Sequence, residues 1–272
     1  MHAVSREALR NTAEFLNSRI TEGGTAMAAA AQTGTELFDV VEVLDDERGL
    51  RVAVADVSAP AAKRSGLAQA VFGGKVSETT ADVLRHAVEA EWSTPRELRS
   101  GLVELGRRSL LLAAKESGQL QQVESELYQL GRLLAREPEL TRLLEERKTD
   151  RASRRDLLAR VLYGKVTSVT EALALQAVGR PERGVIDDMT ALARVAADMQ
   201  GHDLAAVTAA TELNDDQRTA LAAKLERIYG REMSIHTEVD PSLLGGMVIR
   251  VGDEVIDGST SGKLEKMRHQ FA

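Results

Sequence analysis

The sequence predicts a mainly α protein: tandem helical bundles of the six-helix type, followed by a small α+β C-terminal domain with a β-hairpin. Apolar residues make up 43% of the 272 residues and aromatic residues only 3%, so the cores must be built from Ala, Leu and Val, which suits close-packed helices. Apolar residues recur every three to four positions up to about residue 200 and alternate after it. The chain also matches itself when it is shifted by 90 residues.

This internal match indicates a duplication. The shift places residues 35–38, Thr-Glu-Leu-Phe, on residues 125–128, Ser-Glu-Leu-Tyr, and it aligns Gly-Lys-Val-Ser at 74–77 with Gly-Lys-Val-Thr at 164–167. Between residues 61 and 88, 10 of 28 aligned positions are identical without a gap. Helices rich in Ala and Leu resemble one another by composition alone. The common register and the common break after the fourth helix nevertheless favour duplication, with a degenerate first copy.

The periodicity and the capping residues divide each copy into five helices. Pro95 follows Ser93-Thr94 at a first helical position, Pro138 opens a short helix, and glycines close the fourth helix of each copy. A further helix over 183–199 completes a six-helix bundle with the second copy. The expected helices are 4–20, 25–45, 48–56, 60–72 and 77–91 in the first copy, and 95–117, 119–136, 138–147, 152–163 and 168–179 in the second.

From residue 202 the pattern changes to that of an α+β domain. Residues 204–210 form only a weak strand pattern, and Asn214 caps a helix that Gly230 ends, with Gln217 completing a capping box. Apolar residues then alternate over 233–239, 247–251 and 254–256, which predicts a three-stranded sheet with a tight turn at Gly252-Asp253. The buried face of the first helix is expected to carry Leu221, Leu225, Ile228 and Tyr229. A last helix, with Leu264, Met267 and Phe271 on one face, follows Ser259.

We therefore expect three domains, at 1–94, 95–200 and 201–272, with net charges of −5, +2 and −4. The overall charge of −7 disfavours a nucleic-acid-binding protein, which carries a basic excess. The N-terminus lacks the apolar core of a secretory signal, and we expect no membrane-inserted segment. The chain contains 0 Cys, so thiolate nucleophiles and Cys-type zinc sites are excluded.

The motifs that could bind a nucleotide or a metal ion lack the required residues at the required spacing. The run from Gly258 to Lys263 resembles a phosphate loop, but Asp257 takes the place of the first glycine and Leu264 that of the magnesium-binding hydroxyl. No two of the five His are four residues apart, and none lies in a zinc-protease motif. The sequence thus predicts no catalytic, cofactor-binding or metal-binding residue, and a nucleotide-dependent enzyme is disfavoured.

The glycines around the predicted hairpin are more informative. Gly245, Gly246 and Gly252, with Asp257-Gly258, flank a nine-residue strand pair. Glycine in a strand pattern is typical of a bulge or of a close approach by another backbone. Two interpretations remain open: turn chemistry alone, or a surface shaped for a helix of a partner protein.

The sequence from Val239 to Met267, VDPSLLGGMVIRVGDEVIDGSTSGKLEKM, resembles the C-terminal signature of the delta subunit of F-type ATP synthases, which is related to the mitochondrial oligomycin-sensitivity-conferring protein. Residues 105–130 resemble the opening helices of that family, so the resemblance covers about 105–272. The resemblance implies that its signature positions serve the structure or the docking of b subunits; they are Gly245, Gly246, Arg250, Gly252, Asp253, Asp257, Gly258 and Ser259.

The resemblance implies a non-catalytic stator subunit without a cofactor. The 95–200 bundle is expected to bind the amphipathic N-terminal helix of an alpha subunit, and 201–272 the ends of the b subunits. Such a subunit lies peripherally on the cytoplasmic face of the bacterial membrane, within the ATP synthase complex. The 1–94 extension matches the long form expected of actinobacteria. The alternative is a helical-repeat scaffold unrelated to ATP synthase, which predicts more copies at the 90-residue period and no terminal sheet.

Overall fold

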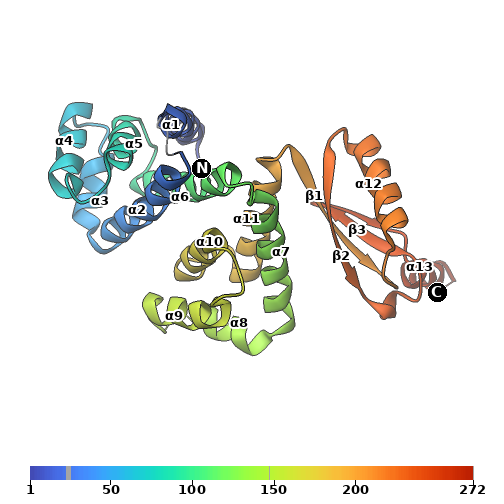
Figure 1. Cartoon of the computed structure of the whole chain (residues 1–272). Helices are drawn as coiled ribbons and strands as arrows, with labels where there is room; N and C mark the ends of the chain where they lie inside the picture. Colours follow the sequence, from blue (N-terminus) through green and yellow to red (C-terminus); the bar gives the residue numbers. More distant parts are fainter. Residues whose placement is uncertain (23–25, 147, 272) are drawn as a thin grey trace. The chain divides into compact units, whose positions relative to one another are not determined.

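The computed structural model describes all residues except 23–25, 147 and 272 (Figure 1). The predicted order of helices, followed by a small sheet with further helices, is confirmed. The helices are α1 (Ala3–Glu22), α2 (Ala26–Asp46), α3 (Arg48–Ala55), α4 (Ala61–Phe72), α5 (Glu78–Glu89), α6 (Pro95–Glu116), α7 (Leu120–Arg136), α8 (Pro138–Glu145), α9 (Arg151–Leu162), α10 (Ser168–Gly179), α11 (Val185–Asp198), α12 (Asp215–Tyr229) and α13 (Thr260–Phe271).

The helix boundaries repeat with the 90-residue period. Helices α3, α4 and α5 begin and end 90 residues before α8, α9 and α10, and α11 begins 90 residues after α6. Helix α6 therefore takes two places in the series, as the sixth helix of the first copy and as the first helix of the second. This register supports the duplication that the sequence indicates.

Local contacts repeat with the helices. The Ser77 hydroxyl accepts a hydrogen bond from the Thr80 amide at 3.3 Å, and Thr167 accepts the equivalent bond from Thr170 at 3.3 Å. Gly74 and Gly164, which follow α4 and α9, have positive φ values of 72° and 67°. Both features are local stop and start signals, which explains why the sequence placed these helix ends correctly.

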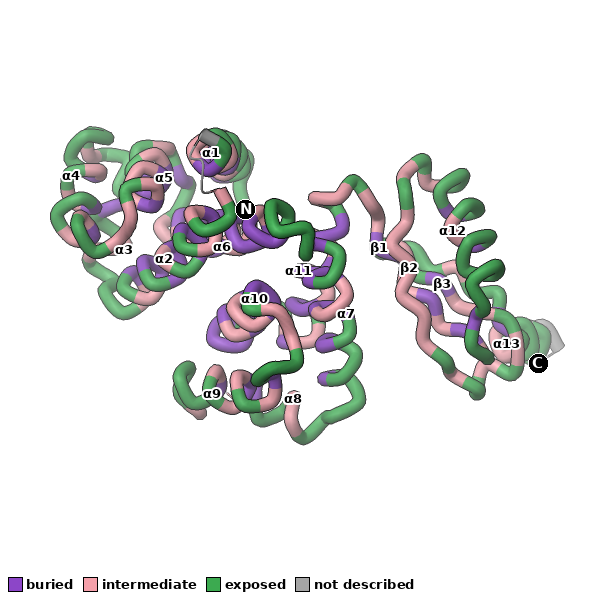
Figure 2. The backbone as a smooth tube through the Cα atoms, in the orientation of Figure 1, coloured by how far each residue is buried: buried purple, intermediate pink, exposed green. Residues whose placement is uncertain are grey.

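The chain divides into two compact units, residues 1–120 with 158–179, and residues 121–157 with 180–272. These units alternate along the sequence, so the expected domain boundaries near 94 and 200 stay predictions. In the first unit, α2 packs along α6, and α10 contacts both (Figure 1). Helix α6 is buried at eleven of its 22 residues, and α10 at eight of its twelve (Figure 2).

Glycines allow α2 and α6 to approach closely. A Cβ on Gly34 would lie 2.9 Å from the Gly106 carbonyl oxygen, and a Cβ on Gly106 would lie 2.6 Å from the Phe38 ring. Next to this crossing the buried Ser109 hydroxyl donates to the Ala30 carbonyl at 2.7 Å. The crossing therefore has no room for side chains at either glycine, and a short hydroxyl satisfies a helix carbonyl.

The second unit contains a four-stranded sheet in the order β2-β1-β3-β4. The strands are β1 (His202–Ala209), β2 (Glu232–Val239), β3 (Met247–Val251) and β4 (Glu254–Asp257). Strand β1 pairs in parallel with β2 and antiparallel with β3, and β3 pairs antiparallel with β4. The expected three-stranded sheet is wrong, because the weak pattern at 204–210 is an internal strand of the sheet. Its alanines lower strand propensity, but burial between two strands and under a helix outweighs propensity.

Helix α12 covers one face of the sheet (Figure 1). Leu221 and Leu225 are buried there with Val207 and Ile249. Asn214 and Gln217 form the expected capping box, and Gly230 ends the helix at φ 71°. The placement of Ile228 on the buried face was wrong, since 65% of its surface is exposed. The buried stripe of α12 runs from Leu225 to Tyr229, which packs against the same cluster, and Ile228 lies outside that stripe.

Candidate docking surfaces

The hairpin formed by β3 and β4 holds most of the predicted signature residues. Gly252, with φ 58°, and Asp253 make its tight turn, and the Arg250 side chain is exposed on β3. At the open end the structure brings 245–246 and 257–260 together. The Gly258 amide donates to the Met247 carbonyl at 3.0 Å, and the Thr260 amide donates to the Gly245 carbonyl at 2.9 Å.

A backbone crossing sets the residue type at Gly246. Its φ is 73°, and a Cβ there would lie 2.4 Å from the Gly258 carbonyl oxygen. Ser259 is buried, donates its hydroxyl to Asp257 Oδ1 at 2.6 Å and accepts from the Gly262 amide at 3.0 Å, so it caps the start of α13. The Asp257 carboxylate fills the space in front of Gly262, where a Cβ would lie 2.2 Å from Oδ2. These contacts give Gly246, Asp257 and Ser259 roles in the turn and the helix cap.

Replacing Gly246 by Ala is expected to lower the free energy of unfolding of the second unit by about 3 kcal/mol, because the new side chain adds left-handed strain and a clash with backbone. The matched control is Gly252→Ala, which has a similar positive φ but no atom within 4 Å of the new Cβ. That variant should lose only about 1 kcal/mol. Urea unfolding of both variants measures the difference, and equal losses would show that the crossing at Gly258 is unimportant.

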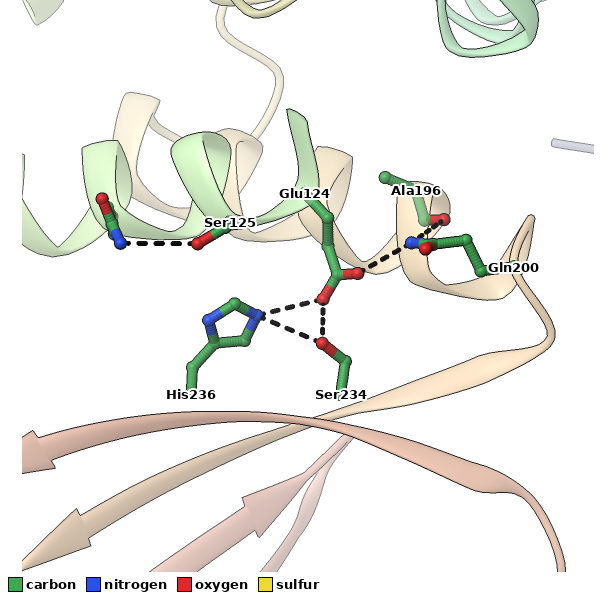
Figure 3. Close-up of polar contacts among 7 residues, drawn as sticks. Glu124, Ser125, Ala196, Gln200, Ser234 and His236 are labelled. Atoms are coloured by element: carbon green, nitrogen blue, oxygen red, sulfur yellow. Dashed lines mark hydrogen bonds and ion pairs between the residues drawn. The ribbon is translucent and has the colours of Figure 1, made fainter. Parts of the chain in front are cut away.

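A polar contact that the sequence did not predict joins α7 to the sheet (Figure 3). It uses the face opposite α12, because Met233 and Ile235 of β2 pack on the α12 side. Helix residues four apart share one stripe, and alternate strand residues share one face. The participants are Glu124, Tyr128, Arg132 and Arg136 on α7, and Ser234, His236 and Glu238 on β2. The polar face of β2 is therefore covered by a helix.

Glu124 is the centre of this contact. Only 1% of its surface is exposed, and its carboxylate accepts hydrogen bonds from the Ser234 hydroxyl and from Gln200 Nε2, the latter at 2.9 Å. His236 Nε2 lies 3.0 Å from Oε1. Burial raises the pKa of Glu124, but hydrogen bonds from His236, Ser234 and Gln200 outweigh it, so the pKa is lowered overall.

Aromatic and ionic contacts flank Glu124. The Tyr128 and His236 rings stack with centroids 4.2 Å apart, and burial raises the pKa of Tyr128. One helical turn further, Arg132 and Arg136 both pair with Glu238. The hydrogen-bonded buried carboxylate fixes the position of α7 on β2 more strongly than the exposed arginines, whose ion pairs are screened by water.

An open groove lies between α7, α8 and the start of α11. It encloses about 590 Å³, and among its lining residues are Leu134, Ala135 and Ile186. Ala135 is exposed on α7, and Ile186 is half-buried on α11. The wall facing them carries Arg142, Glu145 and Glu146. An apolar strip with charges along one side is the shape that fits one face of an amphipathic helix.

In the described residues, no three His, Asp or Glu side chains gather as metal ligands would. Among the described helices we find none with the length and apolar character that a membrane span requires.

Comparisons with known proteins agree with the signature. The sequence model of the ATP synthase delta (OSCP) subunit matches residues 108–271. The ATP synthase subunit delta of Corynebacterium efficiens is 64% identical over all of this chain and 99% of its own length. Those of Corynebacterium glutamicum and Corynebacterium diphtheriae are 62% identical, with 100% of both chains covered. These relatives therefore also contain the 1–94 extension.

A chain of the Toxoplasma gondii mitochondrial ATP synthase hexamer shows a structural likeness with a TM-score of 0.35 and 18% sequence identity, which covers 61% of this chain and 94% of that one. This likeness is too distant to support the family assignment. The family match excludes a repeat scaffold unrelated to ATP synthase. The chain belongs to the delta (OSCP) subunit family of ATP synthase, a structural component of the peripheral stalk.

Proposed function

We propose that this subunit connects the catalytic head of ATP synthase to its b-subunit stalk, so that the head does not turn with the rotor. In this proposal the second helical copy, within 95–200, binds the N-terminal helix of an alpha subunit, and the C-terminal domain, 201–272, binds the b subunits. The subunit acts on the cytoplasmic face of the bacterial membrane as a peripheral part of the complex. It catalyses no reaction itself, and rotor torque is resisted through its two contacts.

The groove between α7, α8 and α11 is the observation that carries the alpha-subunit contact. Among the helices of the second copy, α10 is largely buried and offers no comparable apolar surface. The groove leaves Ala135 and Ile186 accessible beside Arg142 and Glu146, which suits an amphipathic helix.

The first copy differs at the equivalent positions, which supports the choice of the second. Asp45 takes the place of Ala135 and Arg96 that of Ile186. The Asp45 carboxylate is held by Arg99 at 2.9 Å, so a charge pair stands where the second copy has an apolar strip. An apolar helix face would have to desolvate that pair in order to bind there.

Exposed apolar side chains support docking at the C-terminal domain. Large hydrophobic residues are exposed on and around the hairpin and the last helix, and α13 lies against the short η1 helix (Pro241–Leu243). They are Leu244 (69% exposed), Val255 (49%), Leu264 (45%) and Met267 (46%). Apolar surface of this kind typically marks an interface with another protein. The signature glycines shape the hairpin, and these neighbours supply the contact.

Replacing both Ala135 and Ile186 by Glu in the full chain is expected to weaken binding of a synthetic alpha-subunit N-terminal peptide by about tenfold or more. Carboxylates in the groove would have to be desolvated by the apolar face of the helix. Isothermal titration calorimetry measures the affinity. The matched control is Val52→Glu on α3, which is 47% exposed and stands at the first-copy equivalent of Arg142.

Unchanged affinity in the double variant, or a loss in Val52→Glu instead, would assign the peptide to another surface. Deleting 1–94 is a poorer test, because α2 covers much of α6. The deletion would expose an apolar core face, and lost binding could then reflect misfolding.

A further inference from the structure

The 1–94 extension forms a groove together with α6, between α1 and α6. It encloses about 340 Å³. Leu9, Ala13 and Leu105 form an apolar floor, of which Leu105 and Ala13 belong to the core of this unit. The side chains of Arg6, Arg10 and Arg108 surround that floor, together with Glu104.

The charges around this groove are unbalanced. Glu104 lies 3.9 Å from Arg107, and Arg6 donates to the Met1 carbonyl oxygen. In the described part of the chain, Arg10 and Arg108 form no ion pair, and the buried Nε of Arg108 has no hydrogen-bond acceptor. A buried donor without an acceptor is costly, and an acceptor supplied from outside would remove that cost.

This basic rim stands on an acidic background. Residues 1–94 carry a net charge of −5, and the whole chain −7. The groove therefore gathers three arginines and one glutamate within an acidic chain, which favours approach by carboxylates at that point and disfavours other basic surfaces.

The second copy does not repeat this groove. In the second copy Arg99 takes the place of Leu9, and Asp198 takes the place of Arg108. Arg99 is paired with Asp45 at 2.9 Å, and Asp198 with Arg231 at 3.0 Å. The second copy keeps apolar residues at Val103 and Val195, but a paired arginine replaces Leu9 and a paired carboxylate replaces Arg108, so the common fold alone does not require this groove.

We propose that the α1–α6 groove binds an acidic amphipathic helix of a partner protein. The apolar stripe of that helix covers Leu9, Ala13 and Leu105, and carboxylates beside the stripe pair with Arg10 and Arg108. This docking site is separate from the groove proposed for the alpha subunit, and it gives the extension a second contact.

The test uses the full chain assembled into the ATP synthase complex. The photoreactive residue p-benzoylphenylalanine replaces Arg6, which is exposed at the rim of the groove and leaves Arg10 and Arg108 in place. After irradiation, mass spectrometry identifies the crosslinked peptide. We expect a segment of another chain with apolar residues three and four apart and flanking Asp or Glu. The same probe at Val57, 56% exposed beyond α3, should not capture that segment.

A charge variant then tests the recognition. Arg10→Glu, at an exposed position without an ion pair, should lower the crosslink yield by about tenfold, while Arg10→Lys should keep most of it. Thermal unfolding checks that each variant is folded. Capture of this chain itself, of lipid, or of a segment without carboxylates would overturn the proposal, as would no capture or a yield indifferent to Arg10→Glu. Binding of the alpha peptide should be unchanged in Arg10→Glu, which separates this proposal from the preceding one.

Discussion

Gly106→Ala is expected to destabilise the first compact unit by about 2–4 kcal/mol. Ala is favoured over Gly in a helix interior by about 1 kcal/mol, so helix propensity alone predicts the opposite sign. The new Cβ would, however, lie 2.6 Å from Phe38 Cε1 and 3.1 Å from the Gly34 carbonyl oxygen. Neither group can move freely, because Phe38 is buried and the carbonyl belongs to α2. The energetic cost of the clash therefore exceeds the gain in helix propensity.

Gly66→Ala on α4 is the matched control, since it makes the same substitution within a helix of the same unit. Gly66 is exposed, and a Cβ there meets nothing within 4 Å. This variant should gain about 0.5–1 kcal/mol. Urea unfolding of both variants measures the change in the free energy of unfolding and its sign in each. A neutral or stabilising Gly106→Ala would mean that α2 and α6 do not cross as closely as in this structure.

Glu124→Ala is expected to lower the free energy of unfolding of the second unit by about 2–3 kcal/mol. The substitution leaves Ser234, His236 and Gln200 without the carboxylate that accepts their hydrogen bonds, and a bond to a charged group contributes about 1.5–3 kcal/mol. The control Glu139→Ala removes the same charge from an exposed position on α8 and should change stability by less than about 0.5 kcal/mol.

Glu124 also predicts a dependence on pH. Its pKa is lower in the folded chain than the usual 4.5, so folding favours the carboxylate. The resulting stabilisation is complete above about pH 4.5 and is lost as the pH falls through the lower folded value. Wild-type stability should therefore decline more steeply below pH 4.5 than that of Glu124→Gln, which cannot titrate. Parallel curves from pH 6 to about pH 3 would contradict this role of the carboxylate.

Much of the fold is predictable from local signals. The helix boundaries follow from the apolar period and from caps such as Thr94 with Pro95, Asn214 with Gln217, and the positive-φ glycines 74 and 164. The duplication is visible as a shift of 90 residues and returns as equal helix bounds. The signature around the hairpin was sufficient to predict the family.

Other features depended on partners far away in the chain. Strand β1 looked weak because its alanines carry little strand propensity, while its neighbours β2 and β3 follow it by more than twenty residues. Ser234 and His236 looked like the solvent side of a strand, yet Glu124, about 110 residues earlier, covers them. Nothing local to either segment identifies the other.

Thus the sequence by itself determined the elements, their ends, the repeat and the family. Only the tertiary structure showed that α6 serves both copies, that α7 contacts β2, and that each copy keeps an apolar groove where the other has charge pairs. The physical reason is that periodicity and caps depend on neighbours within a few residues. Periodicity and caps therefore show that one face of an element is buried. Which surface covers that face depends on packing between segments that are distant in the sequence.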